Sequence, residues 1–124
     1  MLLDSNIIIY AAQAEHPQIR DFISEHDIAV SALSYVEVLG YHQLTEESRL
    51  YFEEFFRIVE VFPISQAVLD RAVALRQTRR MTLGDAIIAA TALVYDMALV
   101  TRNIEDFQWI GELTLVNPFD AEET

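Results

Sequence analysis

The sequence predicts an α/β domain with a mainly parallel sheet sandwiched by helices. Two observations favour this class. Short apolar segments alternate with longer helical segments from one end of the chain to the other. The chain also has 124 residues, of which 52% are hydrophobic, so it fits one compact domain with a core of its own. In such a sheet, sites form at the carboxyl ends of the strands, where helices begin.

The first part of the chain is predicted to contain two strands and four helices. The segments MLLD and DIAVS are typical of short strands. Apolar residues at helical spacing predict helices over residues 6–12, 17–26 and 34–43, and a longer one from Thr45. The last of these carries an aromatic cluster that we expect to serve as core or dimer surface: Tyr51, Phe52, Phe55 and Phe56.

The second part of the chain continues the alternation. The segment VEVFP predicts a strand that stops at Pro63, and an amphipathic helix follows over 65–80. Residues 82–95 form a nearly all-apolar helix, which we expect to be covered on most sides. Two further short strands are predicted in ALVT and LTLVNP. The acidic tail DAEET is expected to be disordered.

Composition narrows the classes of function. The chain has no cysteine, which excludes disulfides, thiolate metal sites and cysteine nucleophiles and suits a reducing cytosol. No basic segment followed by a long apolar one opens the chain, and the longest apolar run, Ala86 to Tyr95, is about half of a membrane span. These features predict a cytoplasmic protein without a membrane partner.

The charge of the chain is strongly acidic. The formal net charge is −12, and all eight cationic residues are arginine. An acidic surface repels nucleic acid at long range, so a nucleic-acid function would depend on a local site, with metal ions present. A basic protein partner is the simpler expectation from charge alone.

Acidic residues stand where predicted strands end and helices begin. Asp4 follows the first strand, Glu37 lies just after the second, and Asp85 opens the apolar helix. A further junction carries Asn103 and Asp106 after the strand ALVT. Because parallel strands end at the same edge of a sheet, these side chains are expected to converge.

Each acid also has an ordinary explanation as a helix cap. Ser34 and Glu37 match a capping box, and Thr82 and Asp85 resemble the same device. Asp4 could cap the helix that follows it. Any acid in a first helical turn gains roughly 0.3 to 1 kcal/mol from the helix dipole. For each acid taken singly, the capping interpretation stays open.

Taken together, the acids favour a divalent metal. Asp4 and Asp85 lie in long apolar stretches, and converging carboxylates repel one another unless a cation lies between them. Mg²⁺ and Mn²⁺ are hard cations that prefer oxygen ligands. Zinc is not indicated, because the three histidines lie in different segments: His16, His26 and His42. A metal at such a site can activate water and hydrolyse a phosphodiester without a covalent intermediate.

The segments LLDSN, SALSYVEVLG, LGDAIIAATA and LVTRNIEDF resemble the PIN-domain family, and most of all its VapC-type toxin ribonucleases from prokaryotic VapBC toxin–antitoxin pairs. The resemblance spans nearly the whole chain. It implies a three-layer α/β/α fold around a short parallel sheet, a Mg²⁺- or Mn²⁺-dependent endoribonuclease, and a homodimer. It also implies a cognate antitoxin that wraps the toxin and sends a basic side chain toward the acidic pocket.

The resemblance assigns roles to the acids. Asp4 and Asp85 would be direct metal ligands, and Glu37 would bind a second metal or orient the water. Many relatives carry an aspartate at the position of Asn103, so either Asn103 or Asp106 would complete the site. Three neighbours are expected to support the ligands through their hydroxyl or amide groups: Ser5, Asn6 and Thr101.

Three arginines near the expected site are candidates for holding RNA phosphates with forked contacts: Arg79, Arg80 and Arg102. For Arg79 and Arg80 the alternative is the ordinary preference of a helix C-terminus for cations.

Other functions were weighed against the nuclease. A phosphoacceptor receiver domain and a haloacid-dehalogenase-like phosphatase both need a lysine, and the chain has none. The serious rival is a catalytically weak or inactive PIN domain that binds RNA or protein. Asn103 permits that alternative, whereas the retained Asp4, Glu37 and Asp85 argue against it.

Overall fold

The computed structural model describes residues 1–120, and the predicted disorder of residues 121–124 lies outside them. Within this range the chain forms seven helices and one five-stranded sheet. The strands are β1 (Leu2–Leu3), β2 (Ala29–Ser31), β3 (Glu60–Phe62), β4 (Leu99–Val100) and β5 (Leu115–Val116). The helices are α1 (Ser5–Ala11), α2 (Pro17–Glu25), α3 (Ala32–Leu39), α4 (Glu46–Ile58), α5 (Gln66–Thr78), α6 (Leu83–Val94) and α7 (Ile104–Phe107).

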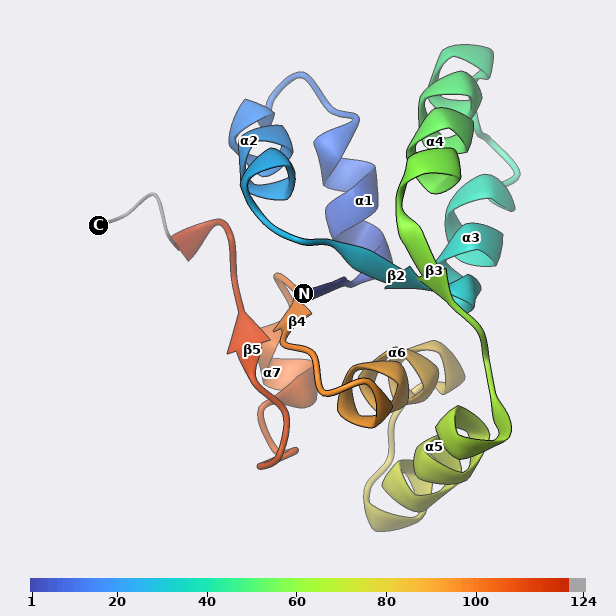
Figure 1. The fold of residues 1–124 in the computed structure, drawn as a ribbon, viewed down its shortest axis with the longest axis vertical. Coiled ribbons are helices and arrows are strands. Elements are labelled where there is room, and N and C mark those ends of the chain that lie inside the picture. The colour runs from blue at the N-terminus through green and yellow to red at the C-terminus, as the bar shows by residue number, and fades with distance from the viewer. Residues whose placement is uncertain (121–124) are drawn as a thin grey trace.

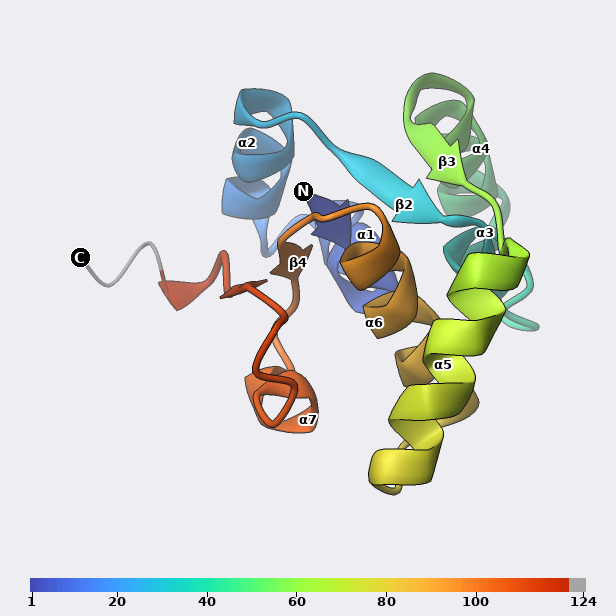
Figure 2. The ribbon, with the colours of Figure 1, turned by 60° about the horizontal axis from the view of Figure 1, so that its bottom comes forward.

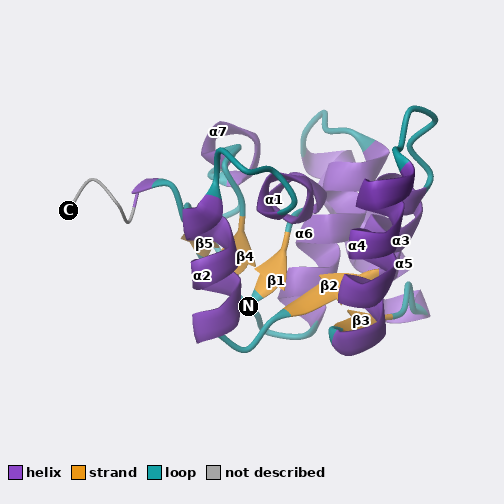
Figure 3. Ribbon diagram, turned by 90° about the horizontal axis from the view of Figure 1, so that it is seen from above, coloured by secondary structure: helices purple, strands orange, loops and turns teal. Residues whose placement is uncertain are grey.

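The sheet is parallel throughout, with the strand order β3-β2-β1-β4-β5. The chain first builds outward from β1 to β3, then returns to the other side of β1 for β4 and β5. The strand order therefore reverses between β1 and β4, which is where parallel sheets place their ligand sites. In Figure 3 both strands run toward the side of the sheet where α1 and α7 lie.

Helices cover both faces of the sheet, as the predicted three-layer arrangement requires. Successive strand residues point to opposite faces, so each two-residue strand supplies both cores. Leu2 packs in the core formed with α5, α6 and α7, while Leu3 packs in the core formed with α1 to α4. Figure 1 shows the two helical layers on either side of the strands.

The apolar helix and the aromatic cluster confirm two expectations. Seven consecutive residues of α6, from Ala86 to Ala92, are buried. In α4, Phe52 and Phe56 are buried in the core, and Tyr51 and Phe55 pack against it. Figure 2 shows α6 between the sheet and α5. Within residues 1–120, no helix combines the length and the apolar character that crossing a membrane requires.

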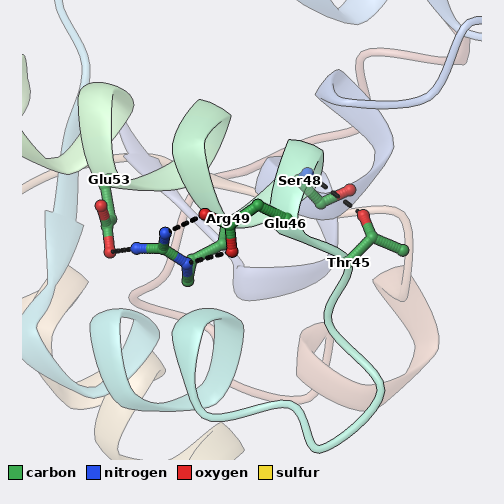
Figure 4. Close-up of polar contacts among 5 residues, drawn as sticks. All are labelled: Thr45, Glu46, Ser48, Arg49 and Glu53. Carbon is green, nitrogen blue, oxygen red and sulfur yellow. Dashed lines mark hydrogen bonds and ion pairs between the residues drawn. The ribbon is translucent and has the colours of Figure 1, made fainter.

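The exposed side of α4 carries its own charge network, which Figure 4 shows in detail. Thr45 caps the helix by accepting a hydrogen bond from the backbone N–H of Ser48 at 3.2 Å. The Arg49 guanidinium donates to Glu46 and, at 2.5 Å, to Glu53. These bonds lower the pKa of the Glu46 carboxyl and raise that of the Arg49 guanidinium.

Two local predictions differ from the structure. Helix α3 begins at Ala32, because Ser31 at the end of β2 caps it by accepting a hydrogen bond from the N–H of Leu33 at 3.1 Å. The capping box of Ser34 and Glu37 is therefore wrong. A short helix, α7, also follows β4 in a segment for which the sequence predicted no helix, and the side chain of Phe107 at its end is fully buried.

Candidate metal centre

Asp4 is the buried acid of the site. It follows β1 directly, and its backbone N–H donates to the carbonyl of Val100 on β4 at 2.9 Å. One carboxylate oxygen caps α1 by accepting from the N–H of Ser5 at 2.8 Å. The other accepts from the hydroxyl of Thr101, at the end of β4, at 2.9 Å. The capping interpretation and the site interpretation thus hold together for Asp4, which stands at the point where the strand order reverses.

Glu37 reaches the same edge from α3 through a pair of hydroxyls. The Ser5 hydroxyl donates to Glu37 Oε1 at 2.7 Å and lies 2.9 Å from the hydroxyl of Ser34, which is fully buried. A serine hydroxyl carries one hydrogen. Since Ser5 gives its hydrogen to Glu37, Ser34 is the donor to Ser5. The chain therefore orients Glu37 with a relay running from α3 through α1.

The other oxygen of Glu37 lies against the start of α6. A Cβ added at Gly84 would lie 3.2 Å from Glu37 Oε2, so the glycine leaves room for this approach. The next residue, Asp85, is half-buried, and its N–H donates to Thr82 Oγ1 at 3.1 Å. Thr82 thus caps α6 as predicted, and it holds Asp85 in the first turn beside Glu37.

The acids act on one another's protonation. Burial raises the pKa of the Asp4 carboxyl from 3.8 to about 6; the Thr101 hydroxyl opposes this rise, while the charges of Asp85 and Glu37 add to it. Burial is also the largest cause of the raised pKa of the Asp85 carboxyl, followed by the charge of Asp106. Among the described residues, no ion pair involves any of these four acids.

The donor set fits a hard divalent cation. Its charged groups are all carboxylates, the ligand type that Mg²⁺ and Mn²⁺ prefer, and their mutual repulsion is what a cation between them would relieve. As they lie in residues 1–120, no three or more His, Cys, Asp or Glu side chains form a group that could hold one metal ion. Binding would therefore draw the carboxylates closer than they lie here. Asp4, Asp85 and Glu37 are the residues that could hold the metal.

A comparison with protein-family profiles matches residues 1–112 to the PIN domain. The chain belongs to the PIN domain family. The match covers the acids at all four junctions and confirms the resemblance found in the sequence. No curated protein sequence matches the chain with comparable significance.

Solved structures resemble this PIN domain over almost its full length. A toxin–antitoxin complex from Klebsiella pneumoniae is 29% identical, with a TM-score of 0.77 and coverage of 94% of this chain and 96% of that one. VapBC-1 from nontypeable Haemophilus influenzae is 25% identical, with a TM-score of 0.78 and coverage of 95% and 97%. DNA-bound VapBC from Salmonella typhimurium, at 19% identity, shares the fold with a TM-score of 0.82 over 94% and 96%.

Asn103 and Asp106 are the two candidates for the fourth ligand position of this PIN domain, and their surroundings differ. The backbone N–H of Asn103 donates to Thr101 Oγ1 at 3.0 Å, and the Thr101 hydroxyl in turn donates to the Asp4 carboxylate. The side chain of Asn103 is exposed and makes no cap bond to α7. Asp106, in the first turn of α7, lines one hollow together with Asp85. Asp106 is thus the other carboxylate that lines this hollow with Asp85.

The three residues predicted to support the ligands also differ in their surroundings. Ser5 and Thr101 are buried and bond to Glu37 and Asp4. Asn6 is exposed, and no hydrogen bond joins its side chain to the described residues. Ser34 was missed as a partner of Ser5, because its spacing to Glu37 equally fits a capping box and no local pattern shows the contact with α1.

The three predicted arginines also lie in different places. Arg102 packs on Phe119 and Tyr10, with its guanidinium carbon 4.1 and 5.3 Å from their ring centres. Arg79 lies over the ring of Trp109 at 5.6 Å. Of the three, Arg80 shares a hollow with Asp85 and Asp106, and Arg76, which the sequence analysis did not single out, lies in the same hollow.

Proposed function

We propose that this chain is a metal-dependent endoribonuclease and the toxin of a toxin–antitoxin pair. The observation that carries the proposal is the series of contacts that brings four acids to one side of the sheet. Ser5 bonds to both Asp4 and Glu37, Glu37 lies against Gly84, which precedes Asp85, and Asp85 lines a hollow with Asp106. No ion pair within residues 1–120 involves any of the four. A site built from repelling carboxylates costs stability, so it is retained for what it binds. Membership of the PIN domain family, whose members are generally nucleases, supports this reaction.

The residues of the chain divide the work. Asp4 and Asp85 would hold the metal, and a bound Mg²⁺ or Mn²⁺ would stabilise negative charge on the scissile phosphate and favour the ionisation of water. Glu37, oriented by Ser5 and Ser34, holds a second ion or aligns the attacking water. Thr101 holds the Asp4 carboxylate by its other oxygen. Asp106, or Asn103 through its amide oxygen, completes the set.

The partner proposed for the toxin is a basic-tailed antitoxin. The chain carries a net charge of −12, and its acids gather at an edge that a basic side chain can enter. The similar structure from Klebsiella pneumoniae is a toxin–antitoxin complex, and the one from Haemophilus influenzae is VapBC-1. We further propose a homodimer acting in the cytoplasm, which light scattering on the purified chain would test by its mass.

The deciding experiment is RNA cleavage by the purified chain with Mn²⁺ or Mg²⁺. Wild type should cleave, and Asp4→Asn and Asp85→Asn should each lower the rate at least about 100-fold, since each removes a charged ligand. Glu53→Gln, on the far side of α4, is the matched control and should keep full activity. If the wild type cleaves no tested RNA and chelation by EDTA changes nothing, the nuclease proposal is wrong.

A second candidate is a PIN domain that binds RNA without cleaving it. The uncharged Asn103, together with carboxylates not yet arranged around one ion, favours this alternative. Asn103→Asp separates the two functions. A weak nuclease gains activity from the added carboxylate, whereas a binding module gains none.

A further inference from the structure

Two arginines near the acids have no partner of opposite charge among residues 1–120. In a chain with twenty acidic residues, three of the eight arginines form ion pairs within residues 1–120: Arg49, Arg57 and Arg71. Arg20, Arg79 and Arg102 lie over aromatic rings. The remaining pair, Arg76 and Arg80, is exposed and does neither in the described part of the chain. This is unexpected in so acidic a protein, because carboxylates are available on every side.

These two arginines lie in a hollow that begins at the candidate metal centre. The hollow has a volume of about 500 Å³ and is lined by Arg76, Arg80, Met81, Thr82, Asp85 and Asp106. A second hollow of about 680 Å³ shares Arg76, Arg80 and Met81 with it and continues along the end of α5 past Gln77 to Arg79. The two hollows together lead from the carboxylates to a basic surface.

The side chain of Arg76 is held by one nitrogen and open at the others. Its Nε donates to the carbonyl of Met81 at 3.4 Å, which ties it to the loop before α6. Among the described residues no acceptor meets its two terminal nitrogens, and Arg80 makes no hydrogen bond of its own.

We propose that Arg76 and Arg80 form a phosphate-binding subsite for the nucleotide next to the cleaved bond, so that the RNA strand leaves the acids across the end of α5. Guanidinium forks bind phosphate in a bidentate way, and a chain of this charge needs a local basic surface to hold RNA at all. The subsite rests on the proposed nuclease function for its ligand. It replaces Arg79 and Arg102, which pack on aromatic rings, as the principal phosphate contacts.

The test measures binding apart from cleavage. A fluorescent single-stranded RNA of twelve nucleotides is titrated with Asp4→Asn protein, which is expected not to cleave, at several salt concentrations between 50 and 200 mM. Adding Arg76→Gln and Arg80→Gln should weaken binding roughly tenfold and lower the slope of log K against log salt by about 1.4, the value for two phosphates on a single strand. Cleavage by the same pair in the wild-type background should show a raised KM with kcat largely kept.

Matched variants decide the outcome. Arg49→Gln with Arg57→Gln removes the same number of charges from α4 and should leave affinity unchanged. If Arg76→Gln with Arg80→Gln behaves like this α4 pair, or if Arg79→Gln with Arg102→Gln causes the larger loss, the subsite is wrong while the nuclease can stand. If the protein binds RNA through Arg76 and Arg80 but never cleaves, the subsite stands and the nuclease is wrong. If it neither binds nor cleaves, both are wrong.

Discussion

The acids of α4 and the acids at the sheet edge are the same residue types in opposite surroundings. On α4, the guanidinium of Arg49 lies between Glu46 and Glu53, and the pKa of Glu46 is lowered (Figure 4). At the sheet edge, Asp4 and Asp85 have raised pKa values because burial and neighbouring carboxylates oppose their charge. The chain thus compensates acids on a surface helix and leaves those at the strand ends uncompensated.

The difference indicates where a metal ion from solution would bind. A paired acid already has a positive partner and gains little from a metal ion. An unpaired group of acids stores repulsion that a bound cation releases as binding energy. The arginines beside the acids follow the same division. Arg76 and Arg80 share a hollow with Asp85 and Asp106 but form no ion pair with them. In our proposal they bind a phosphate of the RNA.

The largest expected effect concerns the pH dependence of the metal-free protein. Asp4 holds its proton more tightly when folded, with a pKa of about 6 against 3.8, so the folded state binds more protons between these values. The free energy of unfolding therefore falls by about 3 kcal/mol as the pH rises from about 4 to 6. Above pH 6 it stays at this lower value. Asp4→Asn, which keeps a capping oxygen, should equal wild type below pH 4 and exceed it above pH 6.

Urea unfolding with EDTA, at several pH values, measures this difference between the two proteins. If Asp4→Asn loses more than about 2 kcal/mol at pH 7, Asp4 is held mainly as a helix cap, and the repulsion argument is wrong.

The next effect is stabilisation by metal. A cation that binds only the folded protein adds about 2.7 kcal/mol to the free energy of unfolding when its concentration is 100 times its Kd. We expect Mn²⁺ to raise the melting temperature of wild type by several degrees, and not that of Asp85→Asn. Glu46→Gln, which alters the paired acids of α4, should keep the full response. An equal response in all three proteins would show that the ion binds elsewhere.

A smaller effect is expected from the relay behind Glu37. Ser34→Ala removes the donor to Ser5 and should cost about 1 kcal/mol of stability, as one buried hydrogen bond does. It should also weaken Mn²⁺ binding severalfold in calorimetry, and this loss should vanish in a Glu37→Gln background. Thr91→Val deletes a buried hydroxyl that bonds within α6 and is the control. Equal losses of Mn²⁺ affinity in both variants would contradict the relay.

The smallest effect should follow from breaking the α4 network. Arg49→Gln removes an exposed set of ion pairs, which water and salt already weaken. We expect a slight loss in urea unfolding at low salt, which disappears in 0.5 M NaCl. RNA cleavage should not change. A loss of cleavage would mean that the acids of α4 and the acids at the sheet edge do not act independently.

The sequence predicts the fold well because the fold depends on patterns that are local. Short apolar segments that alternate with helical segments predict the parallel sheet. Apolar residues at helical spacing predict nearly every helix. The short helix α7 escaped because its four residues make no more than one turn. The start of α3 was misplaced because Ser31 and Ser34 are equally good caps, and the end of β2, a tertiary feature, selects Ser31.

The candidate site is less local, and the sequence indicates only part of its arrangement. Asp4 and Glu37 could be expected at one edge because parallel strands end together, whereas Asp85 opens α6, which follows a helix and not a strand. That Ser34 reaches Glu37 through Ser5 depends on how α1 packs on α3. Likewise Arg76 in α5 and Arg80 in the loop after it share a hollow because that loop lies against the end of α5, where Arg76 Nε donates to the carbonyl of Met81. No spacing within one segment encodes such contacts.

The shortness of β1 has a consequence for engineering the domain. Two residues supply one side chain to each core, and Asp4 follows at once. A single inserted residue before Asp4 would exchange the faces of Leu2 and Leu3 or displace the carboxylate from its strand end, since the side-chain period of a strand is two. Length in this segment is therefore less tolerant of change than side-chain identity, and libraries that vary it should substitute residues and leave their number alone.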